Sequence, residues 1–188
     1  ILETDRLDEA LPANPCLNYQ RETAENLRIK IAQAGIVGLG GAAFPTAEKL
    51  QTLQPIHTLI INGAECEPYI SCDASLIASH AQQVVQGALI MQYILQAERC
   101  IIAIENNMPA TQQALHEATN QKNIQIVSVP AIYPTGGEKQ LIEVLTGKKI
   151  PANSLPTEHG VVCQNVGTAF AVYQAVILGI PLTERIIT

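Results

Sequence analysis

Two carboxylates, Glu65 and Glu67, flank Cys66 in a segment that reads NGAECEPY from residue 62 to residue 69. Carboxylates can accept hydrogen bonds from ribose hydroxyls or from a ring N–H. They can also coordinate a metal, but no His stands near enough in the sequence to support a metal site. A solvated acidic loop is the alternative interpretation, and the residue types alone leave both open.

A glycine-rich run extends from Gly38 to Thr46 and reads GLGGAAFPT. Gly38, Gly40 and Gly41 allow the backbone to approach a ligand closely and to adopt positive φ. Backbone N–H groups at the start of the helix that follows can face a phosphate or a flat ring, and Lys49 can reach the same anion. The spacing fits neither the Rossmann G-x-G-x-x-G nor a Walker A loop. A plain tight turn between two helices is the other interpretation.

A second pair of glycines, Gly136 and Gly137, precedes Glu138 and Lys139 at the start of an expected helix. A Lys in the first helical turn opposes the helix dipole by about 0.3–1 kcal/mol unless an anion lies nearby. A Lys placed against the helix dipole in this way indicates a nearby binding site for an anion. The alternative is a solvated Lys139 beside Glu138.

The last expected helix opens with the sequence NVGT, which contributes Asn165 and Thr168. Asn and Thr at this position can cap the helix, which would be a structural role only. The free N–H groups of a helix N-terminus also suit a phosphate, which would be a binding role.

The elements that must position these segments follow from hydrophobic patterning. Short apolar runs predict buried strands at 58–62, 100–105, 124–129 and 161–164. Helical patterns cover 24–34, 47–53, 73–95, 109–118, 138–145 and 168–178, with Asp73 as the expected cap of the long third helix. This alternation predicts an α/β, Rossmann-like fold with a mostly parallel sheet and helices on both faces.

In an open parallel sheet, ligands bind beyond the carboxyl ends of the strands. The carboxylate segment follows the first strand, Glu105-Asn106-Asn107 follows the second, the second glycine pair follows the third, and Asn165 follows the fourth. The polar and glycine-bearing segments are therefore expected to gather on one edge of the sheet.

Composition limits the class of protein. The chain has 188 residues, 47% of them hydrophobic, and a net charge of -6, which suits one well-cored domain. Acidic balance and scattered basic residues argue against a nucleic-acid partner. No apolar run reaches the ~18 residues that a bilayer span needs. The five cysteines show no C-x-x-C pair and suit a reducing compartment. The four His residues do not have the spacing of metal ligands. The sequence contains no hydrolase motif.

The chain divides into a linker-like segment, 1–20, and one α/β domain, 21–188. It begins with Ile1 and no signal-peptide pattern follows. We therefore expect it to be the middle portion of a longer protein.

Taken together and in this order, the four motif segments resemble the C subunit of the Rnf electron-transport complex, also called Rsx. They are more distantly similar to the NADH- and FMN-binding subunit of respiratory complex I. The match runs from about Glu22 to Thr188. The resemblance implies a noncovalent FMN that is reduced by NADH, an NADH-linked oxidoreductase activity, and the fold of the FMN-binding domain of the complex I flavoprotein.

The resemblance also implies roles for individual residues. Glu65 and Glu67 are implied as catalytic, near the flavin ring and the nicotinamide, and no metal ligand is implied. The implied cofactor-binding residues are Gly38, Gly40, Gly41, Phe44, Lys49, Asn62, Glu65, Glu67, Gly136, Gly137, Glu138, Lys139, Asn165 and Thr168.

Beyond this chain, the resemblance implies 4Fe–4S clusters in a C-terminal part that these residues do not include. It implies the other Rnf subunits as partners, no nucleic acid, and a peripheral place on the cytoplasmic face of the bacterial inner membrane, with membrane contact through those partners. Two rival hypotheses remain: a cofactor-free docking or assembly domain of the same complex, and a sensor that binds a nucleotide without turnover.

This sequence departs from the related patterns at three places. Ala43 stands where the family commonly has the second Gly of Gly-Ala-Gly-Phe-Pro-Thr, and it could crowd a ring or a backbone turn. Lys139 stands where the complex I proteins have a second Glu. The loop around Cys66 is less acidic, with Ala64 and Cys66 in it.

Overall fold

The computed structural model describes residues 12–65, 67–119 and 123–185. The hypotheses that concern Cys66 and most of the expected linker, residues 1–11, lie outside the described residues. From residue 12 on, the linker-like segment is bonded to the domain, because the Cys16 N–H donates to the Val176 carbonyl at 2.8 Å and Lys30 donates to the Asn14 carbonyl at 2.8 Å. A domain boundary at residue 21 stays a prediction.

Four parallel strands form the described sheet: β1 (Thr58–Gly63), β2 (Arg99–Glu105), β3 (Ile124–Val129) and β4 (Val161–Asn165). Their order is β3-β2-β1-β4, so the sheet is wound outward from β1 in both directions. The two central strands are almost entirely buried, which explains why their sequences are continuous apolar runs rather than alternating ones.

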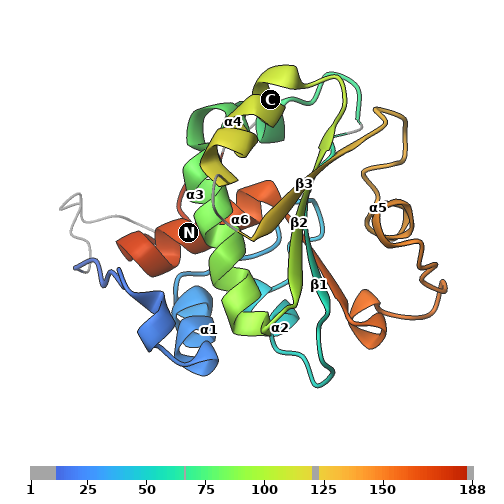
Figure 1. Cartoon of the computed structure of the whole chain (residues 1–188). Coiled ribbons are helices and arrows are strands. Elements are labelled where there is room, and N and C mark those ends of the chain that lie inside the picture. The colour runs from blue at the N-terminus through green and yellow to red at the C-terminus, as the bar shows by residue number, and fades with distance from the viewer. Residues whose placement is uncertain (1–11, 66, 120–122, 186–188) are drawn as a thin grey trace, which may run out of the picture.

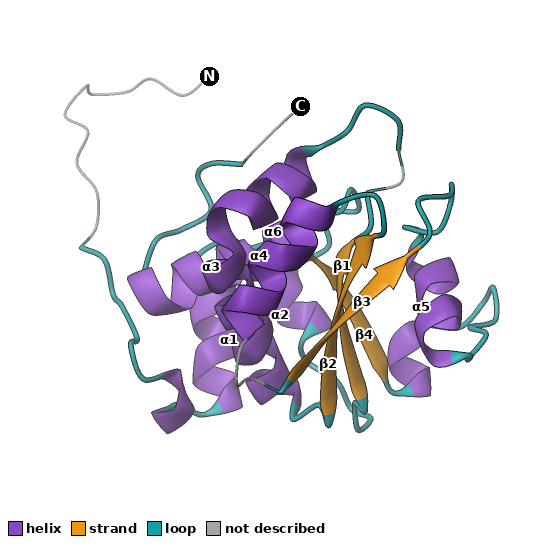
Figure 2. Ribbon diagram, turned by 45° about the horizontal axis from the view of Figure 1, so that its top comes forward, coloured by secondary structure: helices purple, strands orange, loops and turns teal. Residues whose placement is uncertain are grey.

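Helices cover both faces of the sheet, as Figure 2 shows. One face carries α1 (Ala24–Gln33), α3 (Cys72–Leu95), α4 (Pro109–Thr119) and α6 (Val166–Tyr173) over the larger core cluster. The other face carries α5 (Glu138–Thr146), whose Leu141 and Ile142 pack on Ile60, Ala103 and Cys163 in a smaller cluster. The predicted α/β architecture is confirmed, with a fully parallel sheet.

Short elements complete the domain (Figure 1). They are η1 (Tyr19–Arg21), α2 (Thr46–Lys49), η2 (Pro156–His159) and the π-helical turn η3 (Gln174–Leu178), which extends α6. Among the described helices, none combines the length and the hydropathy needed to cross a membrane.

Two helix boundaries differ from the sequence-based expectation. The helix expected at 47–53 runs from Thr46 to Lys49 only, and Leu53 is fully exposed. The cap of α3 is Ser71, so the prediction of Asp73 as that cap was wrong. Asp73 instead lies in the first turn, because the Glu65 carboxylate from the preceding loop already accepts the free N–H groups there.

The long helix α3 is not continuous. His80 has non-helical angles, φ −137° and ψ 33°, and divides α3 into two parts. Farther along, Gly87 lets α3 approach α6 closely, since a Cβ at Gly87 would lie 1.8 Å from the Ala169 carbonyl oxygen. The two helices therefore touch at Gly87.

Candidate functional site

The glycine-rich loop packs on the N-terminus of α6. The Leu39 N–H donates to Thr168 Oγ1 at 2.9 Å, and a Cβ at Gly40 would lie only 3.2 Å from the Cβ of Asn165. Asn165 is the N-cap of α6, and its Oδ1 accepts from the Gly167 N–H at 2.8 Å. Gly40, Asn165 and Thr168 are thus brought together at the carboxyl end of β4, as the sequence predicts.

The loop owes its shape to two residues with positive φ. Gly41 has a φ of +111°, which a residue with a side chain rarely adopts, and Ala43 has a φ of +49°. The Gly38 N–H closes the loop by donating to the Phe44 carbonyl at 2.8 Å. The side chain of Phe44 is about half exposed.

Asn62 joins the end of β1 to the turn before α5. Its Nδ2 donates to the Gly136 carbonyl at 2.8 Å, and its Oδ1 accepts from the Ala64 N–H at 3.0 Å. Gly137 is the N-cap of α5, where a Cβ would lie 3.1 Å from the Pro134 carbonyl oxygen. Asn62, Gly136 and Gly137 therefore lie together.

Three charged residues of this edge, Lys49, Glu138 and Lys139, have partners in the structure. Lys49 Nζ lies 2.7 Å from Glu138 Oε1, with 28% and 40% of the two side chains exposed, which links α2 to α5. Lys139 Nζ donates to the carbonyls of Pro151, Ala152 and Ser154 at 2.7, 2.8 and 3.1 Å. These three carbonyl acceptors stabilise Lys139 in the first turn of α5, so no anion is needed to explain its position there. The sequence did not reveal them.

Glu65 is used at the start of α3. Its carboxylate accepts from the N–H groups of Asp73 at 2.9 Å and Ala74 at 3.2 Å, and from Cys72 Sγ at 3.0 Å. The donor atoms of Glu65, Cys72 and Asp73 lie within 4.8 Å of one another, a grouping that could hold a metal ion. Because both Glu65 oxygens are taken by backbone N–H groups, the arrangement is a helix cap.

Asp73 connects this cap to the glycine-rich loop. Its carboxylate accepts a hydrogen bond from Asn165 Nδ2. The pKa of Asp73 is raised to about 6. Burial is the largest cause, the Asn165 hydrogen bond lowers the pKa, and the nearby Glu65 charge raises it. Burial, and then the hydrogen bond to Glu65, raise the pKa of the Cys72 thiol to about 11. The Cys72 thiol is therefore protonated at neutral pH.

Glu105 is a site candidate that is not among the residues implied by the sequence resemblance. It is the last residue of β2, its side chain is only 4% exposed, and its Oε1 is buried without a hydrogen-bond partner among the described residues. An unsatisfied buried acceptor costs about 1–3 kcal/mol, and more when charged. Burial raises the pKa of Glu105, a hydrogen bond from Asn107 lowers it, and the charges of Glu65 and Glu67 raise it.

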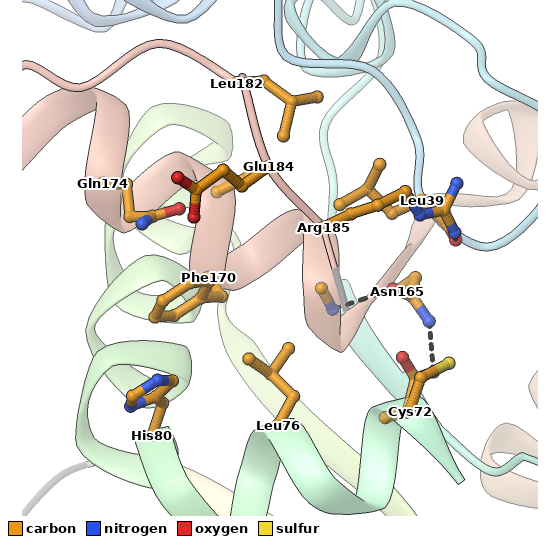
Figure 3. A pocket seen from close by; sticks show the side chains of 13 residues that line it. Leu39, Cys72, Leu76, His80, Asn165, Phe170, Gln174, Leu182, Glu184 and Arg185 are labelled. Carbon is orange, nitrogen blue, oxygen red and sulfur yellow. Dashed lines mark hydrogen bonds between the residues drawn. The ribbon is translucent and has the colours of Figure 1, made fainter. Parts of the chain in front are cut away.

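A cavity of about 270 Å³ lies between α3 and α6, on the face of the sheet opposite α5 (Figure 3). Figure 3 shows the rings of His80 and Phe170 face to face, and their centroids lie 4.9 Å apart at an interplanar angle of 5°. Asn165 is the one predicted site residue among the residues that line this cavity. It is therefore a neighbouring space, which meets the glycine-rich loop at Leu39.

Comparisons with known proteins identify relatives of this chain. The family model described as the Nuo51 FMN-binding domain matches residues 31–174. The C subunit of the ion-translocating oxidoreductase complex of Pseudomonas aeruginosa is 46% identical over 190 residues, which is all of this chain and 24% of the relative. The protein of the same description from Haemophilus influenzae strain PittEE is 46% identical over 189 residues, all of this chain and 29% of the relative. The chain spans about a quarter of the length of these curated relatives.

Two solved structures share the fold, both of the NAD+-reducing NiFe hydrogenase. The air-oxidized form aligns with a TM-score of 0.69 and 26% identity, covering 82% of this chain and 31% of the hydrogenase chain. The H2-reduced form aligns with a TM-score of 0.72 and 23% identity, covering 86% and 33%. The resemblance drawn from the motifs is therefore confirmed for both the Rnf protein and the complex I type of domain.

Proposed function

The chain belongs to the Nuo51 FMN-binding domain family, and from that premise we propose that it is the flavin-binding, NADH-oxidising module of an ion-translocating electron-transport complex. In this proposal FMN accepts a hydride from NADH and supplies all of the redox chemistry, and electrons continue to 4Fe–4S clusters in another part of the protein. The single observation that carries the proposal is the family match over residues 31–174, which contains the described loop edge.

The residues at this edge fit an FMN. Gly40 and Gly41 have no side chain to block the approach of a ring or phosphate to the loop backbone. Lys49 is partly exposed beside that loop, and an ammonium with three donors can hold a phosphate while one donor remains on Glu138. The buried Glu105 Oε1 supplies an acceptor that the described residues leave without a donor.

The proposed roles follow from these placements. The glycine-rich loop, Asn165 and Thr168 would hold the phosphate and ribityl chain, since they meet at the N-terminus of α6. Lys49, which pairs with Glu138 at the start of α5, would reach the same phosphate. The strand-end residues would lie near the flavin ring and the nicotinamide: Asn62, Glu65 and Glu67. In this structure Glu65 stabilises the loop that presents Glu67, so we assign Glu65 to positioning and Glu67 to ligand contact.

Phe44 and the second glycine pair complete the proposed site. The half-exposed ring of Phe44 offers a stacking surface for a base. Gly136, Gly137 and Glu138 would line the nucleotides, while Lys139 would hold the 151–154 loop behind them. Gly38 closes the glycine-rich loop through its bond to Phe44.

The assignment to a larger assembly rests on the named relatives. Their description as one subunit of an ion-translocating oxidoreductase complex supports other subunits of such a complex as partners. We propose a peripheral position at the cytoplasmic face of the inner membrane, with membrane contact through those partners.

A docking domain without a cofactor is the second candidate, and exposed apolar side chains favour it. Tyr69 is fully exposed, and Ile132 and Tyr133 are largely exposed, on the loops that follow β1 and β3. Such residues are common at protein interfaces. Titrating the full-length protein with FMN and with NADH separates the candidates, because the docking domain predicts no saturable signal with either ligand.

A further inference from the structure

The position of Glu105 in the sheet places it beside the proposed flavin ring site. The last register pair of β1 and β2 is Gly63 with Ile104, so Glu105 lies next to Ala64, one residue beyond. Glu105 shares the α5 side of the sheet with Ala103, which packs in the cluster that includes Ala64 and Leu141. Glu105 therefore lies on the same face of the same edge as Asn62.

Of the polar strand-end residues Asn62, Asn165 and Glu105, only Glu105 has a buried oxygen without a partner among the described residues. Asn62 is engaged at both its amide nitrogen and its oxygen. Asn165 is engaged in the same way, by Asp73 and by the Gly167 N–H. Glu105 Oε1, in contrast, is buried and has no partner in the described part of the chain. Buried acceptors without a donor are rare in proteins, and the N–H of a bound ligand would supply the missing donor.

The neighbouring charges decide which ligand chemistry fits. Among the described residues, Glu65 and Glu67 are charged groups close enough to affect Glu105, and both are acidic. A metal ion would need several carboxylate oxygens, and those of Glu65 are already occupied by the N–H groups of α3. A neutral N–H donor needs only the one free oxygen, and a carboxylate is a strong acceptor for it.

We propose that Glu105 is a ligand-binding residue that accepts a hydrogen bond from an amide-type N–H of the bound nucleotide. This inference rests on the proposed function, and its ligand chemistry has two sources. The flavin ring carries an imide N–H, and the nicotinamide carries a carboxamide NH2.

A chemical double-mutant cycle tests the proposal in the full-length protein. FMN is compared with 3-methyl-FMN, which lacks the imide N–H, and binding is followed by flavin fluorescence. Each is titrated into wild type, Glu105→Met, which has a similar shape and no acceptor, and Glu105→Gln, which restores a neutral acceptor. The second arm compares NADH with its 3-acetylpyridine analogue, which lacks the carboxamide N–H, on the FMN-loaded protein.

If the flavin is the donor, 3-methyl-FMN binds wild type about tenfold or more weakly than FMN, and the two flavins bind Glu105→Met within about twofold of each other. Glu105→Gln is expected to lie between these limits. If the nicotinamide is the donor, the same loss of discrimination appears in the second arm only. The proposal is overturned if Glu105→Met discriminates as wild type does in both arms.

Two further readouts separate this inference from a folding defect and from the proposed function. Thermal unfolding of the ligand-free Glu105→Met variant is expected to occur at the same temperature as wild type or higher, because the substitution removes an unsatisfied buried acceptor. Glu117→Met removes an exposed carboxylate on α4 and should change neither binding nor discrimination. If wild type binds no FMN, the proposed function fails; if wild type binds FMN without coupling to Glu105, only this inference fails.

Discussion

Ala43 occupies a backbone conformation that favours glycine, so the substitution Ala43→Gly should stabilise the protein. Its φ of +49° falls in the left-handed region, where a Cβ approaches the following carbonyl oxygen. The neighbouring Ala42 lies in the same exposed loop and is absent from the described positive-φ residues, so Ala42→Gly is a matched control.

The expected magnitude comes from two opposing effects. Relief of the left-handed conformation contributes about 1–2 kcal/mol, while the greater freedom of glycine in the unfolded chain costs about 0.4–1 kcal/mol. Ala43→Gly should therefore raise the free energy of unfolding by up to about 1.6 kcal/mol, and by about 0.8 kcal/mol at the midpoints of the two ranges. Ala42→Gly relieves no left-handed conformation and only increases the freedom of the unfolded chain. It should therefore lower the free energy of unfolding by about 0.4–1 kcal/mol.

Equilibrium urea unfolding, followed by circular dichroism, measures the difference between the two variants. Both changes are Ala to Gly, so the unfolded-state contribution cancels when the free energies of unfolding of the two variants are subtracted. The remaining difference, about 1–2 kcal/mol, is the energy of the left-handed conformation of Ala43. With a slope of about 2 kcal/mol per molar urea, the two midpoints should differ by about 0.5–1 M. Equal shifts in both variants would refute the strained geometry of the glycine-rich loop.

Two other substitutions test contacts at the same edge. The folded-state pKa of Asp73 is raised to about 6 from 3.8, so its ionisation favours the unfolded chain as pH rises through that interval. Asp73→Asn should therefore match wild type near pH 4 and exceed it in free energy of unfolding by about 1–3 kcal/mol at pH 7, by urea unfolding at each pH. A constant difference across this range would contradict the buried carboxylate. Lys139→Met removes three hydrogen bonds to the 151–154 loop and should cost about 1–2 kcal/mol and speed proteolysis there. The control Lys148→Met, at an exposed position, should do neither.

The sheet was predictable because its signals are local. Apolar runs such as the one at β2 indicate buried strands, and a polar or glycine-bearing segment follows each strand. The rule that ligands bind at the carboxyl edge then placed Asn62 and Asn165 at the same edge. The contact of Gly40 with Asn165 extends this edge to the glycine-rich loop.

The side-chain partners were less predictable, because they depend on how distant segments meet. Nothing near Lys139 in the sequence indicates that the 151–154 loop folds back to supply three carbonyls. The Glu65 carboxylate caps α3 only because the intervening loop reverses direction, and this displaced Asp73 from the expected cap position. The kink at His80 was likewise not predictable, because no Gly or Pro lies at that position.

Glu105 shows what sequence pattern can and cannot supply. An acidic residue at the end of an apolar run is visible in the sequence and marks the end of β2. Its burial and its unpartnered oxygen depend on the register of β1 with β2 and on the helix that covers that face. Both facts emerge only once the sheet is assembled.

Flavin binding by the full-length protein is the measurement that bears most directly on the proposed function. The protein should show flavin absorbance when purified, or bind added FMN saturably, and Gly40→Val should abolish that binding because its side chain would press on Asn165. NADH should then bleach the flavin absorbance in the absence of oxygen. A colourless protein that gives no saturable signal with FMN, while its circular dichroism shows it folded, would contradict the account.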